Sequence, residues 1–172
     1  MRDSTLAVAH ALTAAVEALW EGEQIVHRDI KPANVLFDAD GGPVLIDLGS
    51  ALAGQMSDLT TPGNVAPTTY PYSPPELLTP RVRDDATIDF RADLFSVGIV
   101  LAESCLGAHP VWRFGDTPWT YLERLETVDS DFLITCGLEP AIAVVVARAI
   151  SIHPARRYNS IERFREALDG LR

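Results

Sequence analysis

Lysine is almost absent from this chain. Only one of the 14 basic residues is a lysine, and 24 acidic residues bring the formal net charge to −10. So few cations form no basic stripe, which excludes nucleic acid and anionic membrane surfaces as expected partners and leaves basic or neutral proteins as the easier ones. The use of arginine and alanine in place of lysine is typical of a bacterial protein from a GC-rich genome.

Cysteine and uninterrupted apolar runs are also scarce. Cys105 and Cys136 stand 31 positions apart, with no Cys-x-x-Cys pair and no cluster of cysteine with histidine. A disulfide framework and a zinc site are therefore excluded, and reduced, buried thiols in a cytoplasmic protein are expected. The apolar runs 94–106 and 141–152 each contain a charge, and residues 1–20 have the pattern of an amphipathic helix. These features predict neither a membrane span nor a signal peptide.

Length and apolar periodicity predict one mainly helical domain over residues 1–172, with a small β region. The chain has 172 residues and 47% hydrophobic content, enough to bury a single core. Apolar residues at helical spacing predict helices over residues 4–21, 88–106, 118–127, 139–151 and 160–170. Short apolar runs predict strands near residues 25–26, 35–37 and 44–46.

Two segments between these elements read as loops. Residues 38–43 contain two aspartates and two glycines, and their spacing favours a hairpin turn over a calcium-binding loop. Residues 50–72 are rich in Thr, Pro, Gly and Ser without periodicity. A loop of this length in a compact domain is usually functional.

The single lysine lies within the octapeptide from His27 to Asn34. Asp29, Lys31 and Asn34 follow one another at the spacing that suits transfer of a phosphoryl group to a hydroxyl. Asp29 would orient and deprotonate the hydroxyl, Lys31 would place a compact cation on the moving phosphate, and Asn34 would offer an oxygen ligand to Mg²⁺. Taken alone, Asp29 would more often be a surface or capping carboxylate, and the same holds for Asp47.

A second polar motif completes the expected metal site. The apolar residues 44–46 run into Asp47-Leu48-Gly49, which delivers a carboxylate just before a glycine that allows the chain to turn away. Asp47 would therefore be the second Mg²⁺ ligand beside Asn34.

In combination these motifs resemble the Hanks-type, or eukaryotic-like, serine/threonine protein kinases. His27-Arg28-Asp29 with Asn34 is similar to the catalytic-loop signature, and Asp47-Leu48-Gly49 is similar to the Asp-Phe-Gly signature with leucine in place of phenylalanine. Pro74-Pro75-Glu76 looks like the Ala-Pro-Glu motif that closes the activation segment, which would span about residues 47–76. Asp93 resembles the aspartate that opens the central F helix.

The resemblance implies a role for each matching residue. The implied catalytic residues are Asp29, Lys31, Asn34 and Thr69. The implied ATP-binding residues are Lys31, Asn34, Leu36 and Asp47, of which Asn34 and Asp47 would hold Mg²⁺. The implied regulatory residues are Arg28, Thr60 and Thr61, and the implied structural residues are His27, Glu76, Asp93 and Arg157.

Some of these roles have a plain alternative. Arg28 is either a solvated charge or the partner of a phosphate on Thr60 or Thr61. Glu76 and Arg157 are either unrelated surface charges or a buried pair, and the resemblance favours the pair.

The chain also departs from the family pattern, because it contains no Gly-rich loop, no strand lysine and no αC glutamate. The expected fold is therefore a kinase C-lobe with the N-lobe absent. Val35, Phe37 and Leu48 would then be uncovered and form an apolar patch. Self-association, a separate N-lobe protein, or the chain's own N-terminal helix would cover it.

The function implied by the resemblance is transfer of the ATP γ-phosphoryl group to Ser or Thr of a protein substrate. The lobe alone is expected to be inactive. Two alternatives stay open: a non-catalytic, kinase-derived binding module or pseudokinase scaffold, and a nonfunctional gene fragment. A Gly-rich loop encoded immediately upstream would favour the catalytic interpretation.

Overall fold

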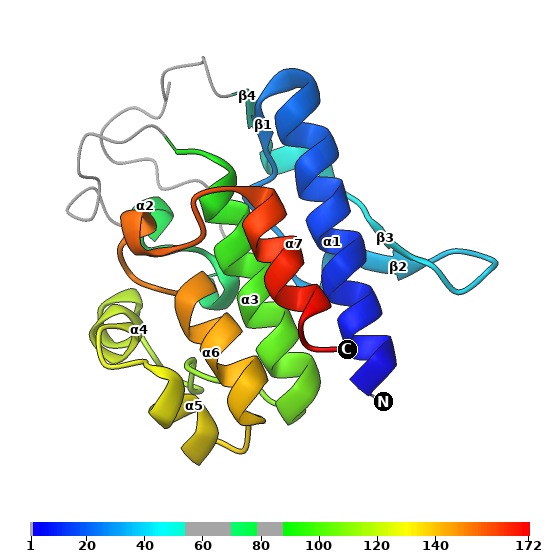
Figure 1. The fold of residues 1–172 in the computed structure, drawn as a ribbon. Coiled ribbons are helices and arrows are strands. Elements are labelled where there is room, and N and C mark those ends of the chain that lie inside the picture. Colours follow the sequence, from blue (N-terminus) through cyan, green and yellow to red (C-terminus); the bar gives the residue numbers. More distant parts are fainter. Residues whose placement is uncertain (1, 54–69, 79–87) are drawn as a thin grey trace, which may run out of the picture.

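The computed structural model describes residues 2–53, 70–78 and 88–172 (Figure 1). The helices are α1 (Arg2–Glu23), α2 (Pro75–Leu78), α3 (Phe90–Leu106), α4 (Pro118–Leu125), α5 (Ser130–Thr135), α6 (Pro140–Ala149) and α7 (Ile161–Asp169). The strands are β1 (Ile25–Val26), β2 (Val35–Phe37), β3 (Pro43–Leu45) and β4 (Leu52–Ala53). The predicted fold class, mainly helical with a small β region, is confirmed.

Helix α3 forms the centre of the molecule, with α1, α6 and α7 around it (Figure 1). Every residue from 92 to 102 is buried, as expected for a helix that is apolar on all sides. The Asp89 side chain accepts a hydrogen bond from Arg91 N and begins the helix, and Gly107 ends it with a φ of 71°. Gly98 allows close approach to α6, because a Cβ there would lie 2.9 Å from Ala149 Cβ.

Helix α1 packs against both α3 and α7. Leu6, Ala9, Leu12 and Val16 recur every three or four residues and are all buried, so they form a single stripe on one face of the helix. Burial of each larger side chain contributes about 1.5 to 3 kcal/mol. The stripe fixes the end of α1, from which the chain enters β1 and the catalytic-loop motif.

The strands form two small antiparallel sheets. β2 pairs with β3 through the predicted hairpin, which projects away from the helices (Figure 1). Asp38 Oδ1 accepts a hydrogen bond from Gly42 N at 2.7 Å, and Gly41 has a φ of 82°, so this segment is a turn stabilised by an aspartate. β1 pairs with β4, placing Ile25 opposite Ala53.

The sequence prediction missed three elements. β4 falls within residues 50–72, which were expected to be irregular, and its partner β1 lies far away in the sequence. Helices α2 and α5 have four and six residues, too few for apolar spacing to reveal. The strand predicted near residues 44–46 is shifted by one residue, to Pro43–Leu45.

Both cysteines are free, as predicted, but the prediction that they are buried is wrong. Cys105 is exposed and Cys136 is half-buried. Cys105 lies near the end of α3, beyond the fully buried stretch of that helix.

In the parts of the chain that the structure describes, no helix combines the length and the apolar character needed to cross a membrane.

Candidate active site

The catalytic-loop motif brings Asp29, Lys31 and Asn34 into direct contact. Lys31 Nζ lies 2.8 Å from Asp29 Oδ2. Asn34 Nδ2 donates to the same oxygen at 3.1 Å and to the Asp29 backbone carbonyl at 2.8 Å. The Asp29 side chain is only 12% exposed, and Asn34 is buried. Lys31 and Asn34 therefore hold the largely buried Asp29 carboxylate in a fixed position.

Helix α3 holds the backbone of this loop through Asp93. Its two carboxylate oxygens accept hydrogen bonds from His27 N at 2.7 Å and from Arg28 N at 2.9 Å. Asp93 is fully buried, and burial raises the pKa of its carboxyl group to about 7, although the two N–H donors act in the opposite direction. The loop is thus attached to the most buried helix of the molecule.

His27 connects the loop to the segment before Asp47. Its Nδ1 accepts a hydrogen bond from Asp29 N at 3.4 Å, so the proton lies on Nε2, which donates to the Ile46 carbonyl at 3.3 Å. Burial lowers the pKa of His27, which favours this neutral form. The role of His27 is therefore to hold two segments together.

Asp47 is exposed and lies next to a second contact between these segments. Ile46 N donates to the Asn34 carbonyl at 2.9 Å, which brings together the two segments that carry the expected metal ligands, Asn34 just before β2 and Asp47 just after β3. Asp47 Oδ1 accepts a hydrogen bond from Gly49 N at 3.0 Å. A Cβ at position 49 would lie 2.9 Å from this oxygen, so a larger residue there would displace the Asp47 carboxylate.

Two residues of the motifs have an unusual backbone conformation. Arg28 and Asp47 both have a φ of 69°, and Gln24 is the only other described residue besides glycine with a positive φ. Such conformations cost about 1 to 3 kcal/mol and cluster at functional sites. Their position in the two motifs supports a functional role for these segments.

An exposed apolar surface borders the motifs. We call it the apolar edge; it consists of Leu36, Phe37, Val44, Ile46 and Leu48. Phe37 is 63% exposed and Leu48 is 55% exposed, as predicted. The prediction that Val35 is also uncovered is wrong, because Val35 is half-buried and packs against the core.

Glu76 and Arg157 form the predicted buried pair. Arg157 Nη1 and Nη2 donate to the two Glu76 oxygens at 2.6 and 2.8 Å. Arg157 Nε donates to the Ser151 carbonyl, and the guanidinium lies 4.9 Å from the centre of the Phe95 ring. Both carboxylate oxygens and all three guanidinium nitrogens therefore have partners in the interior.

The segment just before Glu76 is held by four residues that the sequence analysis did not single out. The Pro71 carbonyl accepts hydrogen bonds from His109 Nε2 at 2.8 Å and from Tyr121 OH at 2.9 Å. Tyr72 OH donates to Glu103 Oε2 at 2.7 Å, and Ser96 Oγ donates to the Tyr72 carbonyl. These contacts join residues that are 24 to 50 positions apart, so no local pattern signals them.

Thr60, Thr61 and Thr69, which were predicted as regulatory and substrate-loop residues, lie outside the described residues. Within the expected activation segment, the structure therefore describes contacts only near the two ends of the segment.

The chain matches the family described as Protein kinase domain over residues 2–157. It is 30% identical to the serine/threonine-protein kinase PknD of Mycobacterium tuberculosis over 156 residues, which are 90% of this chain and 22% of PknD. It is 33% identical to PknH of Mycobacterium bovis over 155 residues, 89% of this chain and 24% of that protein. A probable serine/threonine-protein kinase of Corynebacterium efficiens is 30% identical over 159 residues, 89% of this chain and 22% of that protein.

The chain thus spans about a fifth to a quarter of the curated relatives it matches. The family match covers the catalytic-loop motif, Asp47 and the Glu76–Arg157 pair together. This chain belongs to the protein kinase family, among the Hanks-type serine/threonine kinases.

Proposed function

We propose that residues 1–172 form the C-lobe half of a kinase active site, with an activation segment at about residues 47–76. The lobe would transfer the ATP γ-phosphoryl group to a Ser or Thr hydroxyl of a protein substrate. One observation carries this proposal: Lys31 Nζ and Asn34 Nδ2 both contact Asp29 Oδ2. A cation and an amide therefore meet at the carboxylate that would act as the base. This arrangement supports the proposal, because phosphoryl transfer requires a base and positive charge held close together.

Asp29 would accept the proton of the attacking hydroxyl. Its backbone is held through the preceding residues by Asp93, and its side chain keeps some contact with solvent, so a substrate hydroxyl can reach it. Lys31 would bring positive charge to the transferred phosphoryl group, and Thr69 would help to position the substrate.

The side chains at this site offer donor atoms suited to Mg²⁺ and a surface suited to ATP. Both side-chain hydrogen bonds of Asn34 use its nitrogen, which leaves the amide oxygen as the ligand atom, and Asp47 offers an exposed carboxylate. Hard oxygen donors of this kind suit Mg²⁺, which neutralises phosphate charge when bound. Leu36, 53% exposed on the apolar edge, would contact the adenine ring.

An N-lobe would cover the apolar edge. The 172 residues contain no Gly-rich loop or strand lysine to hold the ATP phosphates, and in this proposal an N-lobe would supply both groups. The exposed side chains of Phe37 and Leu48 support a contact at this surface. Self-association through the same surface would compete with that contact.

Regulation would act through Arg28. A phosphate on Thr60 or Thr61 would pair with the Arg28 guanidinium and order the activation segment. The backbone of Arg28 is fixed by Asp93, so its side chain projects from a defined position.

The alternative function is a non-catalytic binding module that uses the apolar edge to contact a partner. The exposed Leu36, Phe37 and Leu48 favour it, since a scaffold needs such a surface but no base. The two functions differ in whether Asp29 is required.

The test is phosphoryl transfer to a protein substrate by this chain assembled with a kinase N-lobe. We expect Asp29→Asn to lower the rate by about 10²- to 10⁴-fold, the usual effect of losing a general base. Asp40→Asn, in the exposed hairpin turn, is the matched control and should leave the rate unchanged. A full rate in Asp29→Asn would remove Asp29 from catalysis, whereas no phosphoryl transfer by the wild-type assembly would favour the binding module.

A further inference from the structure

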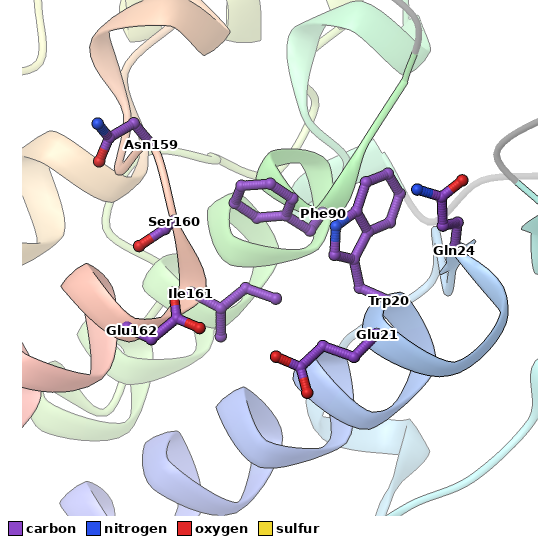
Figure 2. Close-up of a pocket in the computed structure, with 8 residues that line it drawn as sticks. All are labelled: Trp20, Glu21, Gln24, Phe90, Asn159, Ser160, Ile161 and Glu162. Carbon is purple, nitrogen blue, oxygen red and sulfur yellow. The ribbon is translucent and has the colours of Figure 1, made fainter.

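A cavity of about 330 Å³ lies between the end of α1, the first turn of α3 and the start of α7 (Figure 2). Its volume falls within the range of small-ligand pockets, about 300 to 1,000 Å³. No residue assigned above to catalysis, ATP or Mg²⁺ is among the residues that line it. The cavity is therefore distinct from the proposed active site.

One wall of the cavity is aromatic. The rings of Trp20 and Phe90 lie side by side with their centroids 5.4 Å apart, and Ile161 adds a buried aliphatic surface (Figure 2). Trp20 is half-buried, and the accessible part of an indole ring next to such a surface attracts a cation through its negative face and an aliphatic chain through burial.

The rim of the cavity is acidic. Glu21 and Glu162 line it, and together with Glu17 they place carboxylate oxygens within 4.8 Å of one another. Arg165 Nη1 donates to Glu17 Oε2 at 2.5 Å, so this group of carboxylates already accepts one guanidinium. Backbone N–H donation and the Ser160 hydroxyl lower the pKa of Glu162, which keeps it charged and offsets the positive start of α7.

The same combination of groups already binds an arginine within this protein. Arg157 is enclosed by a carboxylate, Glu76, and by an aromatic ring, Phe95. The cavity presents the same two kinds of group, carboxylates at the rim and aromatic rings in the wall, to the outside of the molecule.

We propose that this cavity binds an arginine side chain of a protein partner. The planar guanidinium would stack on Trp20 and donate to Glu21 and Glu162, and the aliphatic stem would lie against Ile161. A metal ion would use the carboxylates but not the aromatic wall, and a lysine ammonium would neither stack nor bind in the same bidentate way. The net charge of −10 also favours a basic partner.

The test is a titration of the 172-residue chain with the blocked tripeptide acetyl-Ala-Arg-Ala-amide. The three indole N–H signals are followed by NMR, and Trp20→Phe assigns the signal of Trp20. We expect the Trp20 signal to shift and those of Trp112 and Trp119 to stay. The double variant Glu21→Gln with Glu162→Gln should weaken binding by about tenfold or more, because two charge-assisted contacts are lost.

The matched control is the double variant Glu23→Gln with Glu166→Gln, which removes the same charge from exposed positions outside the cavity and should preserve binding. An unchanged unfolding midpoint shows that each variant is folded. Equal binding of the citrulline tripeptide would overturn the proposal, as would a carboxylate-dependent Trp20 shift with Ca²⁺ but none with the arginine tripeptide. Tighter binding of agmatine than of the tripeptide would assign the cavity to a small amine and contradict the protein partner.

Discussion

The helical interior around α3 and the apolar edge beside the catalytic loop differ in how completely their groups are satisfied. In the interior, Arg157 is fully buried and bonded to both oxygens of Glu76, and Asp93 accepts two backbone N–H groups. At the edge, Phe37 and Leu48 are more than half exposed beside Asp47. Arg157, Glu76 and Asp93 thus find their partners within the described residues, whereas the edge presents surface that a further component can cover.

This difference assigns stability and function to separate regions. Burial of the α1 stripe contributes to the folding free energy, and removal of one member of the buried pair leaves a charge without a partner, so substitution of these residues should reduce stability. The edge contributes little burial, and its substitution should affect association. Asp93 joins the regions, because it belongs to the interior but holds His27 and Arg28 of the loop.

The largest effect is expected from Arg157→Ala. The substitution leaves Glu76, only 8% exposed, as a buried carboxylate without its partner. We expect the free energy of unfolding to fall by about 3 to 5 kcal/mol, measured by urea denaturation. Arg163→Ala is the control, since its pair with Glu166 is exposed and should contribute less than about 1 kcal/mol. If the two substitutions lowered the free energy of unfolding equally, the buried pair would contribute no more than the exposed pair, which contradicts the prediction.

A pH-dependent contribution is expected from His109. Its Nδ1 accepts hydrogen bonds from Val111 N and Trp112 N, and burial lowers its pKa from 6.5 to about 4. The neutral ring therefore contributes stability that is present above about pH 6.5 and is lost as the pH falls towards 4, up to about 3 kcal/mol.

His109→Gln should remove this dependence. Urea denaturation at several pH values, as a difference between wild type and variant, isolates it from the other titrating groups. Parallel curves for the two proteins would show that His109 titrates normally in the folded state.

A smaller effect is expected from Asp93→Asn, which tests the connection between the two regions. The amide keeps one acceptor but places an N–H group opposite a backbone N–H, so stability should fall by about 1.5 to 3 kcal/mol. Hydrogen exchange at the His27 and Arg28 amides should accelerate more than exchange within α6. Unchanged exchange at these two amides would mean that α3 does not hold the loop.

The smallest effect on stability is expected at the apolar edge. Phe37→Ser should change the free energy of unfolding by less than about 0.5 kcal/mol, because the side chain is largely exposed. It should nevertheless weaken self-association or N-lobe binding, measured by sedimentation. Phe114→Ser, at a fully exposed phenylalanine away from the edge, should leave both unchanged.

Sequence patterns predicted the features that depend on local spacing. The stripe from Leu6 to Val16 predicted α1, and the glycines at positions 41 and 42 predicted the hairpin. The spacing of Asp29, Lys31 and Asn34 predicted a cluster that forms with contacts of 2.8 to 3.1 Å. The Glu76–Arg157 pair followed only from the family resemblance, because its members are 81 residues apart.

Features that depend on long-range packing could not be predicted. β4 depends on pairing with β1, in which Ala53 lies opposite Ile25. The Pro71 carbonyl accepts hydrogen bonds from His109 and Tyr121, which are distant in the sequence. The arginine-binding cavity likewise combines the end of α1 with the starts of α3 and α7. None of these partners is marked by its neighbours in the sequence. Val35 shows the converse, because the tertiary fold half-buries a residue expected to be uncovered.

The most direct test of the account is the rate of γ-phosphoryl transfer as a kinase N-lobe is titrated into the purified chain. We predict a negligible rate without the N-lobe and a saturating, Asp29-dependent rate as the apolar edge becomes covered. The same Asp29-dependent rate in the absence of any N-lobe would contradict the claim that the catalytic side of this chain needs a second component.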